Sequence, residues 1–303
     1  MLKRIESLLG VELAGILYGL IGIAGFSLTL PATKISVQYL NPVFVGFGRA
    51  IVAAILALIL LLVTKQSIPT KSEFKSLSIV SLGVIVGFPL LSAWALKYIH
   101  ASHGAIIIGI IPLATVIAGA LRAGERPSRL FWLLSFCGSL IVLLYALISQ
   151  SGQLEIADVA LLGAVAAAAL GYAEGGKLAQ KMGGWRVISW TLVISAPFLL
   201  FPVILAFEPS TLKAPVEAWL GFAYVSLVSQ FIAFFFLWYK GLALGGISKV
   251  GQVQLLQPFF TIIASALLLD EVITPLVIIT MFLVALVVGL GKFASVQNHN
   301  RVS

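Results

Sequence analysis

Apolar runs separated by short polar breaks follow one another along the whole chain. Most runs hold about 18 to 24 residues, enough for a helix to cross a hydrocarbon core of about 30 Å. The connections are short, and no separate soluble domain fits between the runs. The pattern therefore predicts an all-α polytopic membrane protein. Its ten transmembrane helices are predicted to begin near Leu13, Pro42, Leu77, Gly104, Leu130, Val159, Trp185, Val216, Ile247 and Pro275.

Composition agrees with a protein that is surrounded by the lipid bilayer. Of the 303 residues, 60% are hydrophobic and 10% are charged, whereas soluble proteins contain about 25% charged residues. The formal net charge of +8 comes from basic residues scattered singly through short loops. We therefore expect no nucleic-acid partner, because nucleic-acid binding requires a clustered basic patch.

The basic residues also predict how the chain is oriented. Of the 19 Lys and Arg residues, 15 fall in the segments on the same side as both termini. Basic loops are retained in the cytoplasm, so both termini are predicted to be cytoplasmic. Six acidic residues are predicted to lie on the other side, namely Glu155, Asp158, Glu208, Glu217, Asp270 and Glu271.

An internal repeat relates the two halves of the chain at an offset of 146 positions. Eight pairs of residues are identical: Ser102/Ser248, Pro112/Pro258, Thr115/Thr261, Ile117/Ile263, Ala118/Ala264, Ala120/Ala266, Leu121/Leu267 and Glu125/Glu271. With five helices in each copy, the copies must insert in opposite senses, as two inverted five-helix repeats. We place them at residues 1–150 and 151–303. The matched prolines are expected to break the fourth and ninth helices next to protein or a wet cavity.

Three segments resemble one transporter family. "LTLPATKISVQYLNPVFVGFGRA" carries Lys34, Pro42 and Arg49 in an arrangement similar to the family's. "IIPLATVIAGALRAGERPS" and "LLQPFFTIIASALLLDEVIT" resemble its proline-to-Gly-Glu segment, with Asp270 replacing the glycine in the second copy. On these segments and the duplicated ten-helix plan, the chain resembles the EamA-domain branch of the drug/metabolite transporter superfamily. The resemblance implies a carrier for small metabolites, often an exporter, with a central cavity, cytoplasmic termini and no cofactor, here expected in a prokaryotic plasma membrane.

Glutamines in the ninth helix are the first candidates for a substrate site. Gln254 and Gln257 share a helix face, and Gln257 directly precedes Pro258, where we expect the helix to open. Amides both donate and accept hydrogen bonds, which suits a polar or zwitterionic ligand. Interhelical hydrogen bonding is the equally weighted alternative.

Two basic residues near the outer half each have two interpretations. Arg49 lies about 10 Å inside the second helix, where it could contact an anion or bind carbonyl groups freed near Pro31. Lys34 could line the outward entrance, or its long side chain could reach the membrane interface.

Glu174 and Lys177, three residues apart in the sixth helix, share a helix face. One interpretation is an ion pair between them. The alternative is that the Glu174 carboxylate faces the cavity, where it binds an amine or carries a coupling proton.

Aromatic and remaining polar residues complete the candidates. Most of the aromatic residues are expected to contact lipid or to form interface belts. Trp94, Tyr172, Gln230 and Phe234 are the candidates for the site, whereas Trp238 and Tyr239 are predicted to anchor the inner surface. His100 and His103 are predicted in a solvated outer loop, since two histidines make a poor metal site. Glu125, Asp270 and Glu271 are expected to be loop and capping residues.

The leading hypothesis is a secondary carrier that moves a small amphipathic metabolite, such as an amino acid or related amine, by alternating access. Carriage of sugar phosphates, nucleotide sugars or lipid-linked cargo is the alternative, although Arg49 is the chief basic residue at mid-membrane. An intramembrane enzyme or a sensor is disfavoured, because no catalytic motif and no extramembrane domain is found. Cargo, direction, protons as coupling ion and a homodimer stay open.

Overall fold

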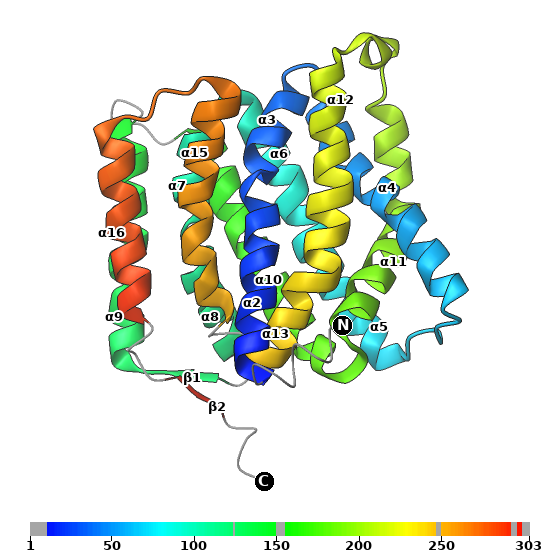
Figure 1. Ribbon diagram of the computed structural model, residues 1–303, viewed down its shortest axis with the longest axis horizontal. Helices are drawn as coiled ribbons and strands as arrows, with labels where there is room; N and C mark the ends of the chain where they lie inside the picture. The colour runs from blue at the N-terminus through cyan, green and yellow to red at the C-terminus, as the bar shows by residue number, and fades with distance from the viewer. Residues whose placement is uncertain (1–10, 124, 150–154, 247–249, 292–295, 299–303) are drawn as a thin grey trace.

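The computed structural model describes residues 11–123, 125–149, 155–246, 250–291 and 296–298, and these residues are almost entirely helical. Their helices lie side by side as ten rods in one bundle (Figure 1). α2 begins and α16 ends at the same end of the bundle, which we name the terminal end. We name the opposite end the far end.

Each repeat contributes five rods. The first five are α2–α3 (Val11–Ser27, Thr29–Val37), α4 (Pro42–Val63), α5–η1–α6 (Lys71–Val80, Ser81–Gly87, Phe88–Tyr98), α7–α8 (Ala101–Ile108, Ile111–Ala123) and α9 (Arg129–Ser149). The second five are α10 (Ile156–Met182), α11 (Gly184–Leu205), α12–η3–α13 (Val216–Ala223, Tyr224–Trp238, Tyr239–Gly245), η4–α15 (Gln252–Leu256, Gln257–Leu269) and α16 (Pro275–Gly291). A short 3₁₀ helix, η2 (Pro209–Lys213), precedes α12.

Apolar length agrees with the predicted membrane spans. Within the described residues, six helices are long and apolar enough to cross a membrane, and four shorter apolar helices accompany them. α4, α12 and α16 begin at their predicted residues, while the start predicted at Ile247 lies outside the described residues. The third rod begins at Lys71 instead of Leu77, because Thr70 and Glu73 form a capping box that starts the helix in a polar segment.

Irregular turns recur in matching rods of the two repeats. The fourth rod is interrupted between α7 and α8, just before Pro112, and the ninth changes from η4 to α15 next to Pro258. Proline lacks the N–H that would continue the helical ladder. The third and eighth rods each contain a π-helical segment, η1 and η3. The predicted inverted five-helix repeats are therefore present, although their boundary near residue 150 lies outside the described residues.

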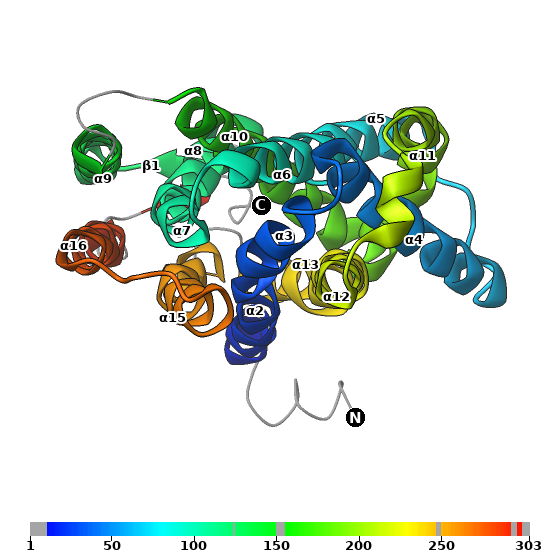
Figure 2. The same ribbon diagram turned by 90° about the horizontal axis from the view of Figure 1, so that it is seen from above.

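The two repeats interlock. The first rod of each repeat packs against the third rod of the other: α2–α3 against α12–η3–α13, and α10 against α5–η1–α6 (Figure 2). α4 pairs with α11, and α9 with α16. Glycine permits the closest approaches, since a Cβ at Gly15 would lie 2.4 Å from the nitrogen of Gly245, and one at Gly83 would lie 2.5 Å from the carbonyl oxygen of Ala167.

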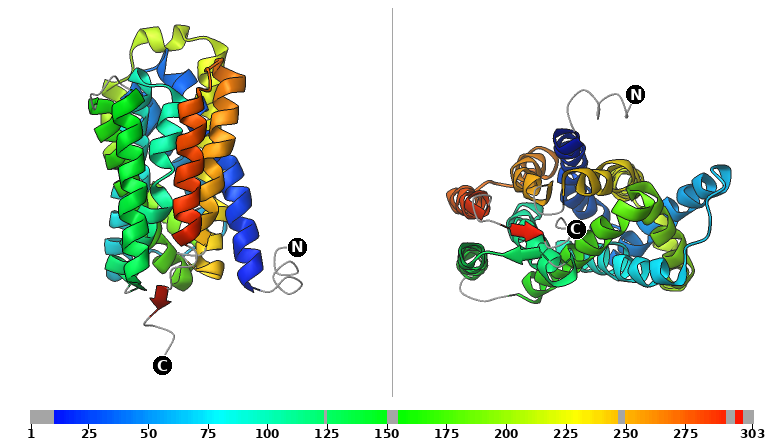
Figure 3. Two further views of the ribbon diagram at one scale, coloured as in Figure 1. Left: turned by 90° about the vertical axis from the view of Figure 1, so that its left-hand side faces the viewer. Right: turned by 90° about the horizontal axis from the view of Figure 1, so that it is seen from below.

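A two-stranded sheet lies at the terminal end (Figure 3). β1 (Glu125–Pro127) pairs antiparallel with β2 (Val296–Asn298), and Arg126 lies opposite Gln297. Glu125, expected in a loop or cap, is therefore a strand residue.

Candidate functional site

A cavity lies between the two repeats where their irregular turns meet. Thr29 follows the junction of α2 and α3, Ile111 begins α8, and Gln257 begins α15. Backbone groups released at such turns are tolerated in a membrane only next to protein or a wet cavity. The cavity is lined by Phe26, Thr29, Leu30, Arg49, Val84, Phe88, Ile111, Tyr172, Ser229, Gln230 and Gln257. The space in which the centre of a water molecule fits is about 10 Å³. The cavity therefore has room for about one water.

Arg49 is the charged residue of this lining. It is 2% exposed, and its Nη2 donates a hydrogen bond to Oγ of Ser229 at 3.0 Å. Ser229 in turn shares a hydrogen bond of 2.8 Å with the hydroxyl of Thr29. The Nε of Arg49 is buried without a partner. The hydrogen-bond partner of Arg49 is thus a hydroxyl of the other repeat, where the sequence suggested carbonyl groups near Pro31.

Two of the three candidate glutamines reach the cavity. Gln230 and Gln257 belong to its lining. Nε2 of Gln230 donates to the Val84 carbonyl at the long distance of 3.5 Å, and its Oε1 is buried without a partner. Gln254 is buried close to the hydroxyl of Tyr172, but its amide atoms lie outside good hydrogen-bond geometry and it is not part of the lining.

The candidate aromatic residues separate into two groups. Tyr172 lines the cavity and packs edge-on against Trp238, with ring centroids 5.5 Å apart. Trp94 is half-buried near the far end of α6, where its ring packs at a tilt against Tyr98, and it is not part of the cavity lining. The side chain of Phe234 lies outside the described residues.

Trp238 and Tyr239 are fully buried, so their predicted role as a surface anchor is wrong. The eighth rod is central, because α2 and α10 cover it. The Tyr239 hydroxyl donates to the carbonyl of Gly171 at 3.0 Å. The prediction relied on the adjacent Lys240, and it failed because the eighth rod packs against other helices along its length.

Glu174 takes neither of the two roles foreseen for it. Its Oε2 accepts a hydrogen bond from Nε of Arg122 at 3.1 Å and forms an ion pair with Nη2 of Arg122 at 3.0 Å, and its Oε1 accepts a hydrogen bond from Ser76 at 2.6 Å. Lys177 instead donates to the Arg122 carbonyl. Glu174 is therefore paired at the terminal end, where it joins α10 of the second repeat to α5 and α8 of the first, and it is not part of the cavity lining.

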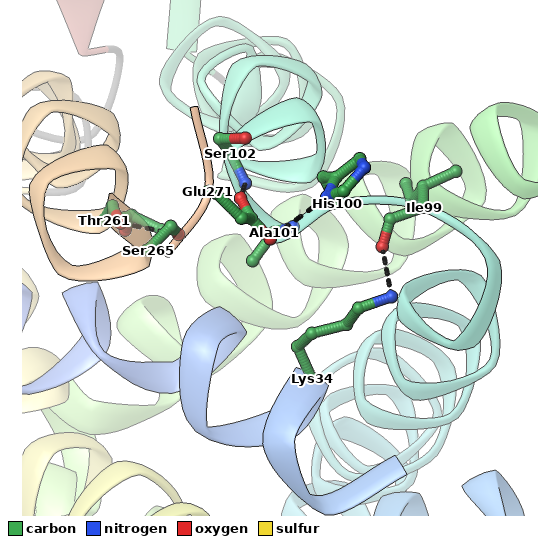
Figure 4. Close-up of polar contacts among 8 residues, drawn as sticks. All are labelled: Lys34, Ile99, His100, Ala101, Ser102, Thr261, Ser265 and Glu271. Atoms are coloured by element: carbon green, nitrogen blue, oxygen red, sulfur yellow. Dashed lines mark hydrogen bonds and ion pairs between the residues drawn. The ribbon is translucent and has the colours of Figure 1, made fainter. Parts of the chain in front are cut away.

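Glu271 closes a corresponding contact at the far end (Figure 4). Its two carboxylate oxygens accept hydrogen bonds from the backbone N–H groups of Ala101 and Ser102, each at 2.8 Å. An acid at these N–H groups also complements the helix dipole. Glu271 is thus a cap, as expected, but it caps α7 of the other repeat. Lys34 lies nearby and donates to the Ile99 carbonyl at 2.9 Å. Its position at the outward entrance stays a prediction.

His103 corrects the prediction of a solvated histidine loop. It lies in α7, is buried, and its Nε2 is 2.7 Å from Oδ1 of Asp158 in the first turn of α10. The Tyr145 ring of α9 lies 5.1 Å away. His100 remains exposed, with Nδ1 3.6 Å from Glu271. The helix begins earlier than predicted, at Ala101, and this turns His103 inward.

Four predicted residues therefore meet in one cavity: Arg49, Tyr172, Gln230 and Gln257. The residues that sequence reasoning missed are Ser229 and Thr29, which together hold Arg49. Ser229 directly precedes Gln230 in the sequence, and Thr29 lies two residues before Pro31. Small polar residues beside a proline or a glutamine within an apolar run were the available signal.

An inverted-repeat helical bundle with a polar cavity between its halves defines a class of protein, the integral membrane transporters. The model of the EamA-like transporter family matches residues 13–147 and again residues 155–290. The chain belongs to this family and is a membrane transporter.

Individual relatives support the assignment. The chain is 45% identical to the "Uncharacterized transporter YdeK" of Bacillus subtilis (strain 168) over 282 residues, which cover 92% of this chain and 98% of the relative. It is 26% identical over 253 residues to the "Uncharacterized transporter YyaM" of the same organism, with 80% and 83% covered. A crystal structure described as "Crystal structure of protein" has the same fold, with a TM-score of 0.64, 18% identity, and 92% and 98% of the two chains covered.

Proposed function

We propose that the protein is a secondary transporter that exports small amphipathic metabolites, such as amino acids, by alternating access. One observation carries the proposal: both repeats line the same cavity, and polar contacts join the two repeats at each end of the bundle. With room for about one water, the cavity has to enlarge toward one end before cargo enters.

The chemistry of the lining supports amphipathic cargo. Arg49, Gln230 and Gln257 supply hydrogen-bond donors and acceptors, while Leu30 and Phe88 supply apolar surface. Binding sites of this mixed kind orient a ligand by a few polar atoms and bury the rest. The plasma membrane and cytoplasmic termini belong to the same proposal and are supported by the basic residues near the terminal end and by the bacterial relatives.

The proposal supplies a physical role for the closures. We name the contact of Glu174 with Arg122 and Ser76 the terminal closure. The far closure includes the contact of Glu271 with the first N–H groups of α7. Alternating access requires that the two closures open in turn. For an exporter, cargo enters after the terminal closure opens and leaves after the far closure opens.

The test replaces one amide of the lining. We expect Gln257→Leu to reduce transport into proteoliposomes at least about tenfold, because it removes a donor and an acceptor from the site. The matched control is Gln180→Leu, whose side chain is exposed on α10, and we expect it to transport normally. Flux of labelled amino acids is measured with and without a proton gradient, after gel filtration shows both variants folded. Normal flux in Gln257→Leu would show that the cargo does not bind in this cavity.

A further inference from the structure

Arg49 is a buried cation that has no counter-ion among the residues that the structure describes. Each ion pair among the described residues joins other side chains. Its hydrogen-bond partner Ser229 is neutral, and its Nε has no partner. A hydroxyl group satisfies an N–H donor but does not neutralise the charge. The site therefore holds one unit of positive charge and at least one unused donor.

A buried charge without a counter-ion lowers the stability of the folded protein. A guanidinium keeps its proton in proteins, and a charge deep in a membrane is expensive unless it is paired or hydrated. The cavity around Arg49 has room for about one water, too little for full hydration. The described residues thus leave the charge of Arg49 to be neutralised by a group that binds in the cavity.

We propose that this group is a carboxylate of the cargo, so that the cavity selects solutes with one carboxylate on an apolar body over amines that lack it. The inference rests on the proposed function and names its cargo class. A planar guanidinium matches a carboxylate with two parallel hydrogen bonds. The carboxylate of such cargo neutralises the charge of Arg49, and the low dielectric around Arg49 strengthens their attraction.

A second unpartnered atom narrows the class further. Oε1 of Gln230 is a buried acceptor in the same cavity, and it fits an N–H donor close to the carboxylate. An amine without a carboxylate finds an acceptor there, but it also meets the uncompensated charge of Arg49. A dianion such as a phosphate ester leaves one negative charge unpaired, because Arg49 is the one cation of the described lining.

The experiment compares solutes that share one skeleton. Thermal unfolding of the purified full-length protein is followed with leucine, isoamylamine, leucine methyl ester and 4-methylpentanoate, and with the corresponding phenylalanine series. A ligand stabilises the state that it binds. We expect the amine and the ester to bind about 10- to 100-fold more weakly than leucine or phenylalanine, which is the effect of losing a charge-assisted pair. Removal of the ammonium group, in 4-methylpentanoate, should weaken binding less.

Variants of Arg49 separate a binding role from a structural one. Arg49→Gln should remove the preference for carboxylates, and Arg49→Lys should keep part of it. Because an unpaired buried charge is unfavourable, Arg49→Met should unfold at or above the temperature of the unsubstituted protein without ligand. Arg129→Gln, an exposed arginine at the start of α9, is the matched control and should bind normally.

Several results would overturn the inference. Equal binding of acids and amines, or a carboxylate preference kept by a folded Arg49→Gln, would show that Arg49 does not select the cargo, while flux would still support the proposed function. A strongly lowered unfolding temperature in Arg49→Met with unchanged selectivity would show a structural role. Absence of flux for every solute tested would overturn the proposed function as well.

Discussion

At the far end of the bundle the carboxylate of Glu271 is held by backbone N–H groups, whereas at the terminal end the carboxylate of Glu174 is held by the side chains of Arg122 and Ser76. Glu271 is 6% exposed, and the far end also contains the buried pair of His103 and Asp158. At the terminal end Arg122 is 39% exposed.

The kind of donor that holds each carboxylate indicates which end of the bundle opens more readily. Backbone N–H groups are fixed to their helix, so separating Glu271 from α7 leaves two donors unsatisfied or moves the whole helix. Arg122 is partly exposed and can move its side chain into water without moving a helix, while Glu174, which is 7% exposed, keeps the hydrogen bond of Ser76. We infer that the terminal closure is the weaker of the two. Under the proposed function, the terminal end is the one through which cargo enters from the cytoplasm.

The largest expected effect comes from removing the far-end carboxylate. Glu271→Ala should lower the free energy of unfolding by about 3 kcal/mol, because two buried N–H groups of α7 lose their acceptor. Glu217→Ala, an exposed acid in the first turn of α12, should have an effect below about 0.5 kcal/mol. Denaturant titration in detergent measures both. If the two variants are equally stable, the contact of Glu271 with α7 does not stabilise the far end.

A smaller effect is expected from the second contact at the far end. Asp158→Asn should destabilise the protein by about 1–2 kcal/mol, because the amide keeps one acceptor but loses the charge that strengthens the contact with His103. Glu155→Gln, exposed one turn earlier, is the control and should leave stability nearly unchanged. If the control loses stability instead, the helix cap formed by Glu155 stabilises this end of α10, and the pair of His103 and Asp158 does not.

The smallest effect is expected at the terminal end. Glu174→Gln should cost about 1 kcal/mol or less, since Arg122 becomes hydrated and Ser76 keeps an acceptor. Because Glu174 is paired away from the cavity, we expect the pH profile of transport to stay unchanged, as in the control Lys177→Gln. Flux measured between pH 5 and 8 tests this expectation, and a shifted profile in Glu174→Gln alone would return this carboxylate to the transport cycle.

The fold could be predicted from the sequence because membrane helices are set by local information. Apolar length gave the rods, and the offset between Pro112 and Pro258 gave the inverted repeat. The ends of helices were less predictable. The start of the third rod depends on the side chain of Thr70, which caps a segment that looks polar.

The candidate site was predictable only where a residue had no local alternative. Arg49 and Gln257 lie inside apolar runs, so a location at the cavity was a natural expectation. Glu174 has Lys177 one turn away, but its partner Arg122 is 52 positions distant in the chain. His103 likewise meets Asp158 across 55 positions. Such pairings depend on how rods from two repeats pack, and no sequence spacing within one helix contains that information.

The crossed packing of first and third rods also sets a schedule for biogenesis. Gly15 approaches Gly245 closely, so α2 leaves the ribosome before a partner that is synthesised 230 residues later. At about 5–20 residues per second, this interval lasts about 10–50 seconds. During that interval α2 exposes its glycine face to lipid or to other nascent helices. The two repeats therefore have to complete their fold together, after the eighth rod has been inserted.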